Sequence, residues 1–199
     1  MVKNPKDYYY WRAKKEGYRS RAAYKLQQLN ERYDIIKRAD TVVDLGASPG
    51  GWLQVAAKLS GSVVVGVDLV DIQPIPGVVS FRGDIRQQRT IEKIKLLTKD
   101  GVDVVLCDAS PNLSGNWNYD HARSIDLCDS ALKCAKQTLK PGGNFVVKAF
   151  QGDMFLRFLN KVKRTFGTVK AYSPQASRKE SAEVYIVGKN IIQKSNLPP

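Results

Sequence analysis

Short apolar runs recur along the chain and alternate with longer amphipathic stretches. The runs Val63-Val64-Val65-Gly66-Val67 and Val104-Val105-Leu106 are apolar at successive positions rather than at every second one. This pattern is typical of strands that are covered on both faces. We predict strands at residues 41–45, 63–68, 78–81, 102–108, 143–149, 168–172 and 182–188, and helices near 51–60, 88–99, 120–139 and 153–165. Strands and helices that alternate in this way predict a doubly wound, mostly parallel α/β sheet.

A glycine-rich turn follows the first predicted strand, and the second predicted strand ends in a carboxylate. The turn reads Asp44-Leu45-Gly46-Ala47-Ser48-Pro49-Gly50-Gly51-Trp52, and the carboxylate is Asp68. A buried strand, a glycine turn and a helix start are typical of a nucleotide-type pocket. Gly46 and Gly50 lack the Cβ atoms that would keep the backbone from a bulky ligand, and Asp68 is placed to accept hydrogen bonds from two ribose hydroxyls.

The spacing of the glycines in this turn argues against a dinucleotide as the ligand. In the dinucleotide fingerprint the second glycine lets a pyrophosphate approach, whereas this chain has Ser48 there, followed by a proline that lacks an N–H donor. A ligand with a ribose and no phosphate fits better. S-adenosylmethionine (SAM) is the commonest such cofactor, so we predict a SAM site rather than an NAD site. The alternative is a tight turn that binds no ligand.

Positive charge dominates the chain and is dense near its N-terminus. The 199 residues carry 32 Lys and Arg against 19 Asp and Glu, a net charge of +13, which favours a polyanionic partner. Basic residues near the start interleave with aromatic ones; they are Lys3, Lys6, Arg12, Lys14, Lys15, Arg19, Arg21 and Lys25, beside Tyr8, Tyr9, Tyr10, Trp11, Tyr18 and Tyr24. Such a mixture suits phosphates and unstacked bases, so residues 1 to about 20 are predicted to contact RNA. The alternative is a solvated basic face whose aromatic residues pack on the body of the protein.

The apolar positions Ala22, Ala23, Leu26 and Leu29 predict a helix docked on the sheet, with Ser20 as its N-cap and Lys25 near the sheet edge.

Several classes of protein are disfavoured by what the sequence lacks. Its cysteines, Cys107, Cys128 and Cys134, form no C-x-x-C pair, and His121 is the only histidine, so we expect no metal site and no disulfide framework. We expect His121 at the surface or at a helix start. No apolar run approaches the ~20 residues of a membrane span, and residues 1–6 lack the apolar core of a signal peptide. The expectation is one cytoplasmic domain over residues 1–199.

Charged residues stand at the ends of the later predicted strands. Asp108 ends the strand at 102–108, Lys148 lies near the end of the strand at 143–149, and Glu183 begins the last strand. In a doubly wound sheet the carboxyl ends of the strands line the ligand crevice. A lysine that ends a buried strand is costly unless it is paired or used. We therefore expect Lys148, Asp108 and Glu183 to converge with Lys25.

Four motifs together resemble the FtsJ/RrmJ family of SAM-dependent RNA 2′-O-methyltransferases. They are residues 44–52, Pro111-Asn112-Leu113-Ser114-Gly115, residues 146–152 and Ser181-Ala182-Glu183-Val184-Tyr185, and the resemblance extends from about Tyr18 to Gly188. It implies a Rossmann-like fold whose mostly parallel sheet has seven strands, the last of them antiparallel. It also implies a catalytic tetrad and a set of cofactor contacts. The tetrad is Lys25, Asp108, Lys148 and Glu183, and the contacts are Gly46, Gly50, Gly51, Trp52, Asp68, Asp84 and Asp108, with Asp84 near the adenine amine.

The resemblance suggests both a reaction and a target. Methyl transfer to a ribose hydroxyl is an in-line displacement, in which Lys148 would position and deprotonate the hydroxyl. Burial and Lys25 would lower the pKa of Lys148, and Asp108 and Glu183 would raise it, so the sequence leaves the balance open. Residues 111–115 and 150–152 resemble the branch that methylates a uridine ribose in 23S rRNA, and residues 12–18 and 76–79 resemble the tRNA branch. We expect a monomer that acts on large-subunit rRNA; the alternatives are a tRNA substrate and a non-catalytic RNA-binding module.

Overall fold

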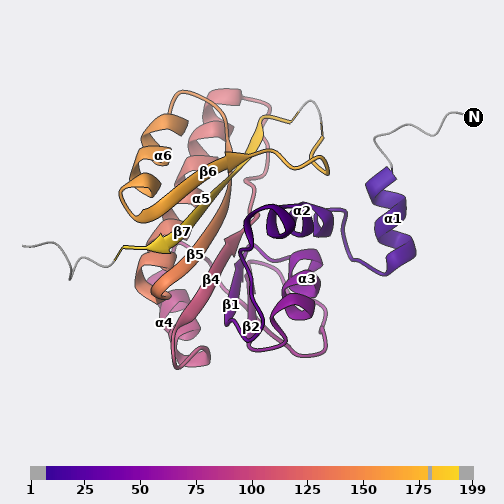
Figure 1. The fold of residues 1–199 in the computed structure, drawn as a ribbon. Coiled ribbons are helices and arrows are strands. Elements are labelled where there is room, and N and C mark those ends of the chain that lie inside the picture. Colours follow the sequence, from indigo (N-terminus) through magenta and orange to yellow (C-terminus); the bar gives the residue numbers. More distant parts are fainter. Residues whose placement is uncertain (1–7, 179–180, 193–199) are drawn as a thin grey trace, which may run out of the picture.

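A seven-stranded sheet forms the centre of the protein (Figure 1). The computed structural model describes residues 8–178 and 181–192. The strand order is β3-β2-β1-β4-β5-β7-β6, and β7 runs antiparallel to both of its neighbours while the other pairs are parallel. The strands are β1 Val42–Leu45, β2 Val64–Asp68, β3 Val78–Arg82, β4 Val102–Cys107, β5 Leu139–Phe150, β6 Phe166–Tyr172 and β7 Glu183–Ile191. This confirms the predicted α/β sheet with its antiparallel last strand.

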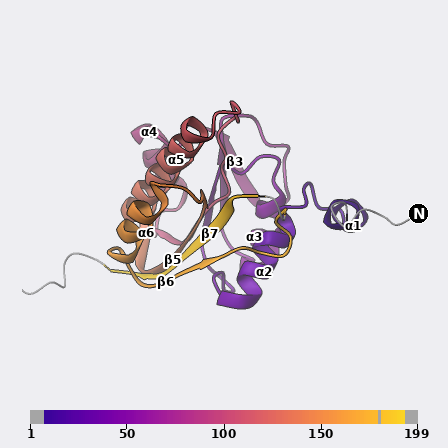
Figure 2. The ribbon, with the colours of Figure 1, turned by 90° about the horizontal axis from the view of Figure 1, so that it is seen from above.

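Helices cover both faces of the sheet, as Figure 2 shows from above. The helices α4 Gln88–Leu97, α5 Trp117–Thr138 and α6 Phe155–Lys163 lie on one face, and α2 Ala23–Tyr33 and α3 Gly51–Ser60 lie on the other. Successive side chains of β1 enter different cores, because side chains alternate along a strand. Val43 packs in the core under α4, α5 and α6, and Val42 packs in the core under α2 and α3. Burial on both faces is the reason that the central strands β1, β2 and β4 read as continuous apolar runs.

The N-terminal segment contains a helix that the pattern did not predict, α1 Tyr8–Glu16. It stands beside the body of the protein in both views (Figures 1 and 2). The helix α2 docks on the sheet as predicted, with Leu26 and Leu29 fully buried. Ser20 as its N-cap was wrong: α2 begins after Ala22 with no side-chain cap, because the Ser20 carbonyl already accepts the Ala23 N–H in a preceding turn.

The expectation of a surface position for His121 was also wrong. The residue lies near the start of α5, which begins three residues earlier than predicted, but its side chain is only 4% exposed. Its Nε2 accepts the Met154 N–H at 3.1 Å, so the imidazole links α5 to the loop after β5. A lone histidine in a polar stretch carries no sequence signal for such a buried contact.

The described residues contain neither a membrane-spanning helix nor a cluster of metal ligands. None of their helices is long and apolar enough to cross a membrane. Over the same part of the chain, no cluster of three His, Cys, Asp or Glu side chains is arranged to hold a metal ion. Cys107, Cys128 and Cys134 are all free thiols in the core.

Candidate active site

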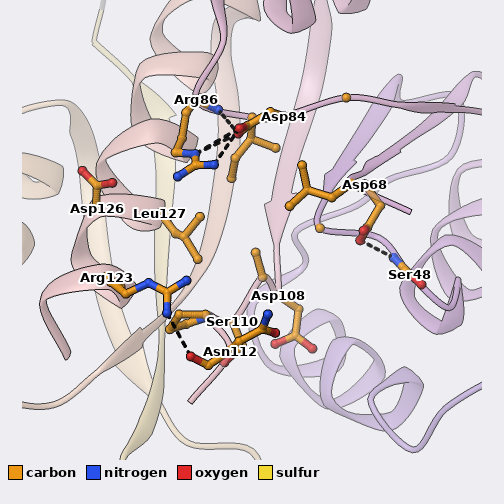
Figure 3. A pocket seen from close by; sticks show the side chains of 16 residues that line it. Ser48, Asp68, Asp84, Arg86, Asp108, Ser110, Asn112, Arg123, Asp126 and Leu127 are labelled. Carbon is orange, nitrogen blue, oxygen red and sulfur yellow. Dashed lines mark hydrogen bonds and ion pairs between the residues drawn. The ribbon is translucent and has the colours of Figure 1, made fainter. Parts of the chain in front are cut away.

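A cavity of about 430 Å³ opens at the carboxyl ends of β1, β2 and β4 (Figure 3). We call it the first cavity, and four predicted contact residues line it: Gly46, Asp68, Asp84 and Asp108. Gly46 has a φ of +73°, and a Cβ on it would lie 2.5 Å from the Ala109 Cβ. A glycine is therefore required for the loop after β1 to pack against the loop after β4.

Three carboxylates, those of Asp68, Asp84 and Asp108, give the first cavity its polar character. The carboxylate of Asp68 accepts the Ser48 N–H at 2.9 Å and the Val70 N–H at 3.1 Å, which fixes its orientation at the end of β2 (Figure 3). Asp84 pairs with Arg86 at 2.7 Å, and this hydrogen bond holds the pKa of Asp84 below its usual range. Each Asp68 oxygen accepts one hydrogen bond and keeps a further acceptor site, which fits a ligand with hydroxyl donors. Both Asp84 oxygens already accept N–H groups of Arg86.

Three predicted contacts lie off the wall of the first cavity. Gly50 is the N-cap of α3 and Gly51 its first residue; a Cβ would press against Ile75 and Arg19 at Gly50 and against Ser20 at Gly51. Trp52 is 3% exposed, and its Nε1 donates to the Ala22 carbonyl at 2.8 Å, which ties α3 to α2. The structure thus gives these residues packing contacts within the α2–α3 layer.

The four tetrad residues meet in a closed ring that a fifth side chain completes. Lys25 Nζ lies 3.0 Å from Glu183 Oε2, and Lys148 Nζ lies 3.3 Å from Glu183 Oε1. Lys148 Nζ also lies 3.1 Å from Asp108 Oδ1. The Tyr185 hydroxyl donates to Asp108 Oδ1 at 2.6 Å and accepts from Lys25 Nζ at 3.0 Å. Lysines and carboxylates alternate around the ring, so each charge has a partner of opposite sign.

Tyr185 is a site residue for which the sequence predicted no role, although it lies in the motif at residues 181–185. One signal could have found it: Glu183 and Tyr185 are two residues apart on β7, and such residues share a face of a strand. The lining of the first cavity also includes Arg86 and Arg123, which the sequence did not single out. Arg123 donates to the Asn112 carbonyl at 3.0 Å (Figure 3).

The structure decides the balance at Lys148 that the sequence left open. Burial alone would lower the pKa of Lys148, but Asp108 and Glu183 outweigh it, so the pKa of this lysine is raised above its ordinary value. Burial would raise the pKa of Glu183, but Lys148 and Lys25 hold it below its ordinary value. Burial, reinforced by Asp108, raises the pKa of Tyr185 well above its usual range. At neutral pH in the free protein, Lys148 is therefore an ammonium, Glu183 a carboxylate and Tyr185 a neutral phenol.

A second cavity, of about 920 Å³, lies on the other side of the ring. Lys25 and Glu183 line it together with Trp117 and Phe150. Ser110, in the loop after β4, lines both cavities. The ring of lysines and carboxylates thus stands where the two cavities adjoin, with Asp108 facing the first and Lys25 and Glu183 facing the second.

Comparisons with known proteins give the family. Residues 18–191 match the model of the FtsJ-like methyltransferase family. A protein of Methanosarcina mazei named ribosomal RNA large subunit methyltransferase E is 63% identical over 193 residues, 96% of this chain and 72% of that protein. A protein of the same name from Archaeoglobus fulgidus is 56% identical over 188 residues, 94% of this chain and 97% of that protein.

Solved structures agree with the sequence comparison. A crystal structure described as that of a ribosomal RNA methyltransferase from Plasmodium falciparum superposes with a TM-score of 0.79 at 31% identity, covering 87% of this chain and 98% of that one. A protein described as a hemolysin from Streptococcus thermophilus has a TM-score of 0.61 at 16% identity, which shows the fold alone. The chain belongs to the FtsJ-like methyltransferase family and is a methyltransferase.

Proposed function

We propose that this methyltransferase transfers the methyl group of SAM to the 2′-hydroxyl of a uridine ribose in large-subunit rRNA. The observation that carries the proposal is the ring of Lys25, Glu183, Lys148, Asp108 and Tyr185 at the junction of two cavities. A transfer between a small donor and a large acceptor needs two such sites that meet at the reacting atoms. The names of the archaeal relatives support rRNA as the acceptor.

The first cavity is the proposed site of SAM. Asp68, already oriented by two backbone N–H groups, would accept hydrogen bonds from the ribose hydroxyls, and Asp84 would face the adenine amine. Gly46 supports the assignment, because a side chain there would collide with Ala109 and disrupt the wall. When bound, SAM supplies a methyl group on a sulfonium sulfur. Gly50, Gly51 and Trp52 would support the site through the packing of α3 rather than from the cavity wall.

Lys148 is the proposed residue that holds the target hydroxyl and accepts its proton. Its Nζ is fixed by the carboxylate of Asp108, by the Asp108 carbonyl at 2.9 Å and by Glu183. Because its pKa is raised, Lys148 holds a proton in the free protein and must lose it before it can accept another. The neutral amine is therefore the minor form of Lys148 at neutral pH. Lys25 and Glu183 would orient Lys148 from the side of the second cavity.

The N-terminal basic segment is the proposed RNA-contacting surface. Its aromatic residues divide into two groups: Tyr24 is buried and packs with Tyr9, whereas Tyr10 and Trp11 are 43% and 57% exposed. Lys14 Nζ lies 4.9 Å from the centre of the Tyr10 ring and 5.4 Å from that of Trp11. A cation beside exposed rings suits a phosphate and an unstacked base. Lys3 and Lys6, also predicted to contact RNA, lie outside the described residues.

We further propose that residues 1–199 act as one methyltransferase domain, as a monomer and in the cytoplasm, where large ribosomal subunits are found. Apart from the short basic segment, nothing in the described residues forms a separate RNA-reading unit. Phosphate contacts position an RNA but carry little sequence information. Selection would then depend on the shape of a folded target, which a ribosomal particle supplies.

The test uses methyl-labelled SAM, with large ribosomal subunits and tRNA from cells that lack this enzyme. We expect label in rRNA, recovered as 2′-O-methyluridine after digestion to nucleosides. Lys148→Ala, which leaves the first cavity intact, is the matched control and should bind SAM without transferring label. Label found only in tRNA would favour the tRNA branch. A folded protein that binds SAM and labels neither RNA would favour a non-catalytic role.

A further inference from the structure

The second cavity has an aromatic wall that the ring of lysines and carboxylates does not use. Trp117, the first residue of α5, is 47% exposed and lines this cavity. Its indole lies nearly parallel to the His121 ring, with centroids 6.0 Å apart, and to the Phe150 ring, 5.9 Å away. Both partner rings are buried, at 4% and 6% exposure. The indole therefore rests on two buried rings, and about half of the residue's surface stays exposed beside the cavity.

Hydrogen bonds on both sides hold this wall in place. The Asp120 carboxylate accepts the N–H and hydroxyl of Ser114 and the Gly115 N–H, which fixes the loop before α5. Asn116 caps the helix by accepting the Tyr119 N–H at 3.2 Å. An ordered surface binds a ligand at a lower entropic cost than one that must first be arranged.

The loop after β5 is fixed in the same way. His121 Nε2 accepts the Met154 N–H, and a Cβ on Gly152 would lie 2.9 Å from the imidazole ring. Gly152 thus leaves room for the imidazole beneath Trp117. The wall is set before any ligand arrives.

The surroundings of the indole are suited to an anionic, partly aromatic ligand. The cavity is lined by three cations, Arg21, Lys25 and Arg178, and by two carboxylates, Asp120 and Glu183. The Asp120 carboxylate is already occupied by Ser114 and Gly115, and Glu183 pairs with the lysines of the ring. A protein of net charge +13 attracts polyanions in general, but an exposed ring on buried rings is a surface for a flat apolar group. A nucleotide presents both a phosphate and a flat base.

We propose that the nucleobase of the target nucleotide stacks on Trp117 while its ribose lies at Lys148. This inference rests on the proposed function, because it takes the occupant of the second cavity to be RNA. Stacking on an aromatic ring tolerates any base, since every base has a π face. Trp117 is then a positioning residue. It selects a nucleotide whose base is not stacked on the neighbouring bases, and it does not distinguish uridine from other nucleotides.

The kinetic test compares Trp117→Phe with Trp117→Leu on large ribosomal subunits from cells that lack this enzyme. Both variants keep an apolar side chain over Phe150 and His121, and only phenylalanine keeps a π face. We expect kcat/KM for the subunits to fall about tenfold to a hundredfold in Trp117→Leu, the range that stacking one base supplies. Trp117→Phe should retain most of the activity, and both variants should bind SAM as the unchanged protein does. Tyr119→Leu, at a 56% exposed position of the same helix outside both cavities, is the control.

A fluorescence measurement covers the case in which a variant folds poorly. In Trp11→Phe the remaining tryptophans are Trp117 and Trp52, which is 3% exposed. Hexauridylate, added until the anisotropy of a labelled oligomer shows saturation, should quench the emission of Trp117.

Equal activity of the Phe and Leu variants, or saturated binding without quenching, would overturn the stacking. Quenching in a protein that methylates no RNA would instead overturn the proposed function and leave the stacking supported.

Discussion

The Tyr185 hydroxyl joins the two lysine–carboxylate pairs, and Tyr185→Phe removes it with little change in packing. The hydroxyl makes two hydrogen bonds to charged groups, at 2.6 Å to Asp108 and at 3.0 Å to Lys25. Hydrogen bonds to charged partners each contribute about 1.5–3 kcal/mol. In the variant Lys25 keeps Glu183 and Asp108 keeps Lys148, so neither charge is left unpaired. We therefore expect a total loss of about 2–3 kcal/mol in the free energy of unfolding, below the sum of two full bonds.

Differential scanning calorimetry measures this loss directly. For a chain of this size 1 kcal/mol shifts the transition temperature by about 2–4 °C, so we expect a fall of roughly 4–12 °C. Tyr119→Phe, at an exposed position, is the matched control and should leave the transition where it is. A transition temperature of Tyr185→Phe equal to that of the control would refute the reasoning, because it would mean that the hydroxyl carries no net stabilisation in the ring.

Three further predictions concern chemistry, cofactor and RNA. Because the pKa of Lys148 is raised, the neutral amine is a small fraction at every pH below the ordinary lysine pKa of about 10.4. Single-turnover methylation at saturating SAM should therefore rise by nearly one log unit per pH unit from about pH 7 to pH 9. Lys148→Arg, which keeps its proton, should be inactive throughout, and a flat profile in the unchanged protein would move proton acceptance to another group. Asp68→Ala should weaken SAM binding by about 1–3 kcal/mol in isothermal titration calorimetry, and unaltered affinity would remove Asp68 from the ribose site. Replacing Lys14 and Lys15 by alanine should reduce the slope of log affinity for RNA against log salt by up to about 0.9 per lost phosphate contact, whereas an unchanged slope would place the RNA surface elsewhere.

The sequence predicted the sheet well because burial on both faces leaves a strong apolar signal. Strands such as β2 and β4 are buried almost throughout, and their ranges were predicted to within a residue or so. Ser20 and α1 are two features that the apolar pattern did not predict correctly. A cap depends on whether the preceding backbone has already turned, and α1 is amphipathic over only nine residues, seven of them exposed. Neither feature is visible in a pattern of apolar positions.

Convergence of the charged site residues could also be predicted, because the ends of neighbouring strands meet at one edge of the sheet. Asp108 follows β4, and Lys148 and Glu183 lie on the adjacent strands β5 and β7. The closing role of Tyr185 depends on its contacts with Lys25 and Asp108, which come from two other parts of the chain. Gly50, Gly51 and Trp52 lie off the cavity wall because the start of α3 packs against the segment that precedes α2. Local sequence does not specify such long-range contacts.

The sign of the Lys148 pKa has a consequence for the order of events. Asp108 and Glu183 hold Lys148 in its charged form in the free protein. An ammonium can donate to the oxygen of an entering ribose hydroxyl, but it cannot accept the proton of that hydroxyl. Lys148 must therefore lose a proton before the methyl transfer, and this is the reason that we expect the rate to rise with pH.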